Sequence, residues 1–229
     1  MKNLILIPTL FIVFNSAFAQ LNVTGQASLS VQPEKTIISY SIVSTKDSYN
    51  EAIDGMNFRI DALTQSLVKI GFKKEEIKTS NFNIHQNRKY RQGEAKGLEY
   101  TASQTLEIKF DYSTKRLLEV LNKTASDDSA PSVSIAFGMS DEQEVRVKKQ
   151  LIKMAVADAK DKADVLAEST GYKISGIKEI NYGGSSNMPR NYAGNMGMMK
   201  SFAESDMSNF EAKDLTISDQ VFISYEISK

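Results

Sequence analysis

Two kinds of residue in this chain could support chemistry: one histidine and a group of methionines. The histidine, His85, would be the natural base for an activated nucleophile, because nucleophilic catalysis needs a base beside the attacking group. It falls in an expected strand over residues 81–86, in the register opposite to the apolar Phe82 and Ile84, and no G-x-S-x-G element accompanies it. We therefore interpret His85 as a solvent-facing strand residue and assign no catalytic residue.

Other reactive groups in the sequence have simpler explanations. Two pairs have S-x-x-K spacing but no K-T-G element: Ser66 with Lys69, and Ser175 with Lys178. Three pairs of acids are adjacent: Glu75-Glu76, Asp127-Asp128 and Asp141-Glu142. Adjacent side chains do not normally face one another, so these acids are better explained as loop charges or as favourable charges at a helix N-terminus. A hydrolase would need carboxylates that the fold brings together, and we expect no enzyme.

The methionines gather in one unusual segment. Residues 183–213 form a connection of about thirty residues without clear periodicity, which is longer than a compact domain usually keeps without a purpose. Its methionines are Met188, Met196, Met198, Met199 and Met207. Thioethers suit Cu(I), so a copper site at Met188, Met196, Met198 and Met199 is one hypothesis. We favour a flexible loop that packs on the protein or on a neighbouring subunit, without metal or cofactor, and a sacrificial sink for oxidants is a third hypothesis.

The N-terminus predicts export. Lys2, the apolar stretch from Leu4 to Phe14 and the small residues Ala17 and Ala19 are typical of a secretory signal peptide cleaved after Ala19. The apolar stretch is about half of the roughly twenty residues that cross a bilayer. We therefore expect residues 1–19 to be removed and the mature chain, residues 20–229, to have no transmembrane segment.

The composition indicates where the protein is located and which classes of partner it does not bind. The chain has no cysteine, which excludes disulfides and thiolate metal sites and is ordinary for an envelope protein of a Gram-negative bacterium. We therefore predict a periplasmic location. The 28 basic and 28 acidic residues balance, and this argues against a nucleic-acid binder or a protein of anionic membranes, because both usually carry a strongly basic face.

Hydrophobic periodicity predicts the elements that position these residues. Alternation over residues 21–31 and 38–42 predicts two strands, joined by a turn at 32–35 into an antiparallel hairpin. A capping-box spacing at Ser48 and Glu51 begins a helix that Gly71 ends. Its apolar face comprises Ile53, Met56, Ile60, Leu63, Leu67 and Ile70.

The second part of the chain follows the same rules. We predict a long hairpin around residues 87–97, a short helix after Ser113, and strands at 133–139, 174–182 and 215–227. The longest helix runs from about Asp141, capped by Ser140 with Gln143, to Gly171. One of its faces carries Ile152, Ala155, Ala159, Ala163 and Leu166, whose small members would let the helix lie close to a sheet.

These elements predict an α+β fold in the order β-β-α-β-β-α-β-α-β-β. Antiparallel sheets would pack against one long and one medium amphipathic helix and one short helix. Strands, a helix and further strands occur on either side of about Phe110. Whether the two halves are a duplication is left open.

The sequence resembles the SIMPL-domain family of exported bacterial proteins. The resemblance follows the family's order along nearly the whole mature chain, although no single motif is highly specific. The opening hairpin resembles V-S-G-E-G and V-x-P-D, with Gln26 and Ala27 where Glu and Gly are more usual. The matching segments are Val23–Ala27, Val31–Glu34, Ile70–Phe72, Glu75–Ser80, Tyr100–Leu106, Ile135–Asp141 and Ala155–Ala163.

The resemblance implies a noncatalytic envelope protein. Members are described as periplasmic or outer-membrane-associated immunogenic proteins, some linked to oxidative-stress tolerance, and no family active site exists to transfer. We therefore expect a periplasmic binding or assembly protein, with a homo-oligomer or another envelope protein as partner and a role in envelope integrity or stress tolerance. Copper handling is the alternative, and a hydrolase is a weaker one.

Overall fold

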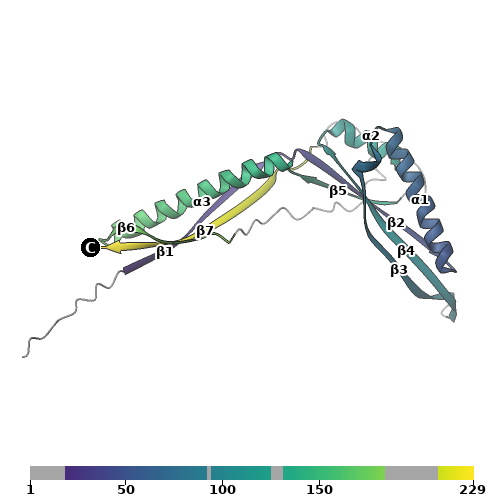
Figure 1. Ribbon diagram of the computed structural model, residues 1–229, viewed down its shortest axis with the longest axis horizontal. Coiled ribbons are helices and arrows are strands. Elements are labelled where there is room, and N and C mark those ends of the chain that lie inside the picture. The colour runs from purple at the N-terminus through teal and green to yellow at the C-terminus, as the bar shows by residue number, and fades with distance from the viewer. Residues whose placement is uncertain (1–18, 92–93, 125–130, 184–210) are drawn as a thin grey trace, which may run out of the picture. The chain divides into compact units, whose positions relative to one another are not determined.

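The computed structural model describes residues 19–91, 94–124, 131–183 and 211–229 (Figure 1). The predicted signal peptide up to residue 18 and all five methionines of the predicted loop lie outside the described residues. The elements follow the predicted order, and the α+β fold is confirmed. The chain divides into two compact units, one around a four-stranded sheet and one around a three-stranded sheet.

The four-stranded unit has two α-helices on one face of an antiparallel sheet (Figure 1). Its strands, in the spatial order β3-β4-β2-β5, are β2 (Lys35–Lys46), β3 (Ile77–Arg91), β4 (Glu94–Asp111) and β5 (Ser132–Gly138). Its helices are α1 (Tyr49–Lys69), the 3-10 helix η1 (Lys74–Glu76) and α2 (Thr114–Thr124). The Ser48 hydroxyl accepts the Glu51 N–H at 3.3 Å at the start of α1, and Gly71, with φ +95°, follows its end. Both predicted helix boundaries are thus confirmed.

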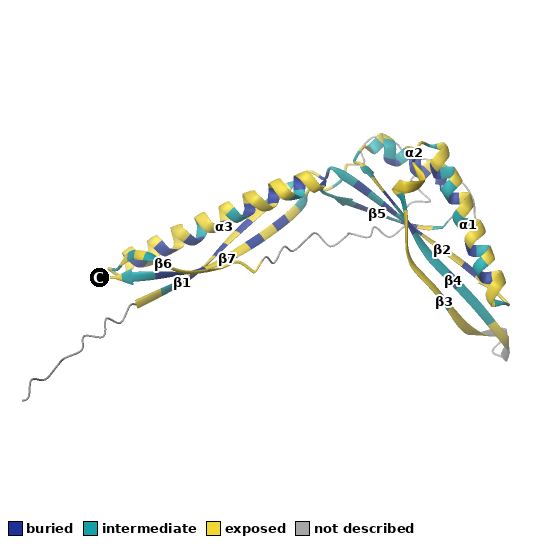
Figure 2. Cartoon of the chain, viewed as in Figure 1, coloured by how far each residue is buried: buried dark blue, intermediate teal, exposed yellow. Residues whose placement is uncertain are grey.

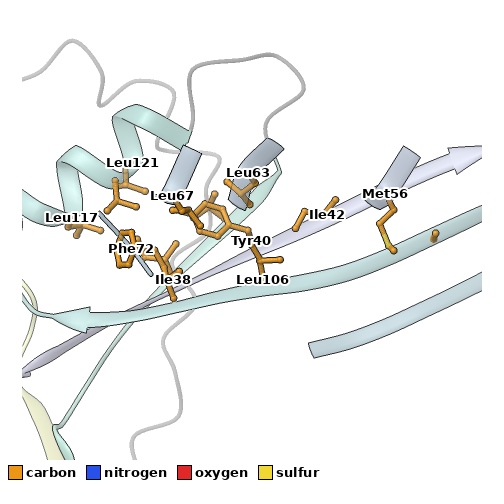
Figure 3. Close-up of a cluster of buried hydrophobic side chains, with 14 of the residues drawn as sticks. Ile38, Tyr40, Ile42, Met56, Leu63, Leu67, Phe72, Leu106, Leu117 and Leu121 are labelled. Carbon is orange, nitrogen blue, oxygen red and sulfur yellow. The ribbon is translucent and has the colours of Figure 1, made fainter. Parts of the chain in front are cut away.

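The hydrophobic core of this unit lies between the helices and the sheet (Figure 3). Tyr40, at the centre of β2, has no exposed surface, and its hydroxyl lies 3.2 Å from the Thr124 hydroxyl of α2. Burial of each large aliphatic side chain stabilises the fold by about 1.5–3 kcal/mol. The largest of these side chains are Ile38, Ile42, Met56, Leu67, Leu106, Ile108 and Leu117.

The three-stranded unit is built from parts of four elements. These are β1 (Ala19–Val31), α3 (Asp141–Ser169), β6 (Lys173–Asn181) and β7 (Leu215–Ser228), and the sheet order is β1-β7-β6. Gly25 of β1 is buried against α3: a Cβ added there would lie 2.7 Å from the Cβ of Ala159 and closer still to the Ala155 carbonyl oxygen. The prediction that small residues allow a close helix-to-sheet approach is therefore confirmed.

The predicted N-terminal hairpin is wrong, because β1 and β2 belong to different sheets. The connection at residues 32–34 hydrogen-bonds elsewhere. The Glu34 N–H donates to the Gly138 carbonyl at 3.0 Å, and the Glu34 carbonyl accepts the Tyr112 N–H at 2.9 Å. Pro33 between the strands is buried and has no N–H to donate. The segment therefore leads from one sheet into the other instead of closing a turn.

Two apolar positions differ from their predicted burial. In α3 the buried row recurs every four residues through Val147, Leu151, Ala155, Ala159, Ala163 and Ala167, so Ile152 is only half-buried and Leu166 is exposed. In β3, Phe82 is 54% exposed. The pairing with β4 shifts between Ser80 and Asn83, and Asn81 has φ 55°. This bulge takes Phe82 out of the regular alternation.

None of the helices in the described part of the chain has the length and apolar character needed to cross a membrane.

Candidate functional site

The predicted reactive residues occupy ordinary structural positions where the structure describes them. His85 is exposed on β3, opposite Thr101 of β4, which confirms its solvent-facing assignment. The Ser66 hydroxyl donates to the Ala62 carbonyl at 3.0 Å within α1. Within the described ranges, no three histidine or acidic side chains converge into a metal-binding group.

Members of two predicted pairs of adjacent acids contact neighbouring groups of the protein. The Glu76 carboxylate accepts the Lys73 N–H at 2.8 Å at the start of η1, and Asp141 begins α3, with its carboxylate 3.7 Å from Lys109 Nζ. Ser175 and Lys178 lie exposed on β6. Asp127 and Asp128, like the methionines proposed for copper, fall outside the described residues. Glu76 therefore binds the backbone at the start of a helix, and Asp141 forms a surface ion pair.

The feature that best suits a binding role is the face of the four-stranded sheet opposite its core. Residues paired across neighbouring strands share a face, so the printed register defines this surface. Its central part, which we call the hydroxyl face, consists of Ser39, Ser41, Val43 and Thr45 of β2, Ser80, Asn83, His85 and Asn87 of β3, Thr101, Ser103 and Thr105 of β4, and Ser132 and Ser134 of β5. All thirteen residues are exposed or half-buried. Figure 2 colours the strands that carry them by burial.

The side chains of the hydroxyl face form rows across the strands. One row consists of Ser132, Ser41, Thr105 and Ser80, one residue from each strand. Another row, four residues further along β2, consists of Thr45, Thr101 and His85. The Thr45 and Thr101 hydroxyls lie 3.0 Å apart, and the Asn87 amide donates to the Thr101 hydroxyl at 3.5 Å. These rows present many hydrogen-bonding groups in one fixed array.

Charged residues stand in both end rows of the hydroxyl face. In one end row Glu107 lies between Ser39 and Lys78, and in the other Glu99 stands opposite Asn87. Between these two rows, His85 is the one ionisable side chain among the described strand residues of the face. This array could not be recognised from sequence alone, because it requires the register of four strands, although the uncharged alternate positions of β2 and β4 were a signal.

A second feature protects the outer edge of β1. The Gln26 N–H donates to the Asp158 carboxylate at 2.7 Å, and Lys162 Nζ donates to the Thr24 carbonyl at 3.2 Å and to Asp158 at 2.6 Å. Two backbone groups that an added strand would use are therefore already bound by α3. We call these contacts of Asp158 and Lys162 with β1 the clamp. The hydrogen bonds from Lys162 and from the Gln26 N–H lower the pKa of Asp158, so the clamp persists at neutral pH. It is lost as the pH falls through that lowered pKa.

Replacing Asp158 with alanine should open this edge. We expect faster hydrogen exchange at the Gln26 amide and increased self-association at high protein concentration, because the N–H loses its acceptor. Exchange measured by NMR and sedimentation would show both effects. Asp161→Ala, at an exposed position of the same helix, is the control. Equal exchange at Gln26 in the two variants would contradict the clamp.

A third feature joins two distant segments within the four-stranded unit. The Ser140 hydroxyl donates to the Glu34 carboxylate and accepts the Gln143 N–H at 3.1 Å, while Arg146 donates to Glu34 at 3.0 Å. The Gln143 side chain donates to the Gln32 carbonyl at 2.8 Å. Ser140 thus caps α3, as predicted, and Glu34 holds the cap in place.

Ser140→Ala should lower the free energy of unfolding by about 1–2 kcal/mol, because the first turn of α3 loses its side-chain acceptor and Glu34 loses a donor. Urea unfolding followed by circular dichroism measures this change. Ser30→Ala, at an exposed strand position, should cost much less. A Ser140→Ala loss no larger than that of Ser30→Ala would exclude a stabilising cap.

Segments that resemble the SIMPL family contact one another in the fold. Val23–Ala27 meets Ala155–Ala163 where Gly25 and Gln26 contact α3, and Val31–Glu34 meets Ile135–Asp141 at the Glu34 and Ser140 hydrogen bond. The contact at Gln26 uses its backbone N–H, so a glutamine in place of the more usual glutamate leaves it intact.

The model of the SIMPL family, described as a protein of unknown function (DUF541), matches residues 21–225. No curated protein matches the chain.

Proposed function

Because this chain belongs to the SIMPL family, whose function is unknown, we propose that it is a noncatalytic binding or assembly protein of the periplasm. The observation that carries the proposal is the hydroxyl face, an ordered array of hydroxyl and carboxamide groups on a four-stranded sheet. The motifs that the chain shares with the family are used in helix caps and close packing, which supports a scaffold. The leader sequence supports export.

The proposed partners are a second copy of the chain and another protein of the envelope. The clamp on β1 limits strand addition there, so an assembly would use other surfaces. A role in envelope integrity or oxidative-stress tolerance belongs to the same proposal, as does association with the outer membrane.

Fractionation of cells and light scattering test this function together. Expressed with its leader, the protein should be recovered from the periplasmic fraction after cleavage behind Ala19. The mature chain should elute in size-exclusion chromatography with light scattering as a discrete oligomer, or as a stoichiometric complex with a protein crosslinked to it in the envelope. A cytosolic, monomeric and uncrosslinked chain would overturn the proposal.

Copper handling is the competing function, and the methionines of residues 183–213 are the observation that favours it. Anaerobic titration with Cu(I) separates the two functions. The binding proposal expects no stoichiometric uptake. Tight uptake that disappears when Met188, Met196, Met198 and Met199 are all changed to leucine would establish the copper function instead.

A further inference from the structure

The edge strand β6 of the three-stranded sheet carries exposed isoleucines. Among the described strands, β6 has β7 on one side and no neighbour on the other. Ile177 stands opposite Tyr225 of β7, and Ile180 stands opposite Ile223. Residues paired across two strands share a face of the sheet. The two β7 residues are buried, whereas Ile177 is 57% and Ile180 is 56% exposed, so the cover over this face ends at β6.

Two irregularities in β6 place its isoleucines on one face. The pairing with β7 shifts between Ile174 and Gly176 and again between Ile177 and Glu179, and each shift inserts one extra residue. In a regular strand, isoleucines three residues apart would fall on opposite faces. Such bulges also interrupt the row of backbone groups that an added strand would use. A regular strand is therefore a poor partner for this edge, and a strand with the same irregularity is a better one.

The sequence of β6 is complementary to itself when two copies run antiparallel. With a two-fold axis between Lys178 and Glu179, Ile177 of one copy stands opposite Ile180 of the other. Lys178 then stands opposite Glu179, and the bulge at these residues faces its own copy. Other antiparallel registers also place isoleucine opposite isoleucine, but only this one opposes the two unlike charges. The other described positions pair without like charges: Ile174 with Gly183, Ser175 with Tyr182, and Gly176 with Asn181.

We propose that the edge of β6 joins two copies of this chain about a two-fold axis between Lys178 and Glu179. The inference rests on the proposed assembly function and names the surface and the partner. Exposed isoleucines meet across the axis, and the ion pairs on either side of it set the register. Such a contact uses the same surface on both copies and closes at two, while the clamp protects the other edge of the sheet.

Charge reversal tests this register. Lys178→Glu and Glu179→Lys each place like charges opposite one another, so each variant should weaken self-association of the mature chain at least about tenfold at low ionic strength. An equimolar mixture of the two variants restores unlike pairs and should associate within about threefold of the unchanged protein, as should the double variant Lys178→Glu/Glu179→Lys. Sedimentation velocity over a range of concentrations measures each dissociation constant. Lys153→Glu, the same change at an exposed position of α3, is the matched control and should leave association unchanged.

Three results would overturn the β6 interface. They are an unchanged protein that stays monomeric at high concentration, single variants that associate as strongly as Lys153→Glu, and a mixture that associates no better than its two components. The proposed function is judged separately, because a periplasmic assembly held by another surface, or a complex with another envelope protein, would survive each of these results. Conversely, a β6 dimer found only in the cytosol would refute the envelope role alone.

Discussion

A Gly25→Ala chain should lose about 3 kcal/mol or more of its unfolding free energy. The new Cβ would lie 2.7 Å from the Cβ and 2.8 Å from the backbone nitrogen of Ala159, and nearer still to the Ala155 carbonyl oxygen. Two of these three neighbours are helix backbone, which cannot turn aside as a flexible side chain can. Either α3 shifts away from β1 or the strand distorts, and both reduce packing in the three-stranded unit.

Thermal denaturation by circular dichroism measures the loss. For a chain of this size we expect the midpoint to fall by about 6–12 °C. Gly176→Ala is the matched control, because it lies in the same sheet and its added Cβ would meet only the end of the Glu226 side chain, at 3.6 Å. If the two alanine variants melt together, the close approach of α3 to β1 is wrong.

Raising the pH from 10 to 12 should destabilise the four-stranded unit through Tyr40. Burial raises the pKa of Tyr40 to about 12, against an ordinary value of 10.0. In this interval the unfolded tyrosine releases its proton and the folded tyrosine keeps it, so the unfolded state binds fewer protons and stability falls as pH rises. The full difference corresponds to about 3 kcal/mol, of which about 2 kcal/mol is lost between pH 10 and pH 12.

Urea unfolding at pH 9 and at pH 11.5 tests this slope. Tyr40→Phe removes the titrating hydroxyl and its contact with Thr124, so the variant should be somewhat less stable at pH 9 and less sensitive to pH. Tyr49→Phe, at an exposed position, should keep the pH dependence of the unchanged protein. An unchanged slope in Tyr40→Phe would show that other groups cause the alkaline loss.

Local patterns were sufficient to predict the elements. The alternation around Ile38 and Tyr40 and the three-to-four spacing through Met56 and Leu67 reflect burial on one face, which each segment records in its own sequence. Ser48 and Gly71 marked the ends of α1 because capping is also local. The family assignment relied on the same kind of short segment.

Partners distant in sequence were not predictable in this way. The Gln20 side chain donates to the Ser224 hydroxyl across a separation of 204 residues, and no periodicity indicates that β1 pairs with β7 rather than with β2. The hydroxyl face was missed for the same reason. The exposure of His85 followed from alternation, whereas its place beside Thr101 followed only from register.

The position of β7 at the centre of the three-stranded sheet has a consequence for biogenesis. β1 is the first described strand and β7 the last, so an emerging chain holds β1 without its neighbour until nearly all of it has been made. Such non-local pairing is slow to form. In the proposed export the chain would therefore cross the membrane with this sheet still open, and the sheet would close only after the final strand has been released.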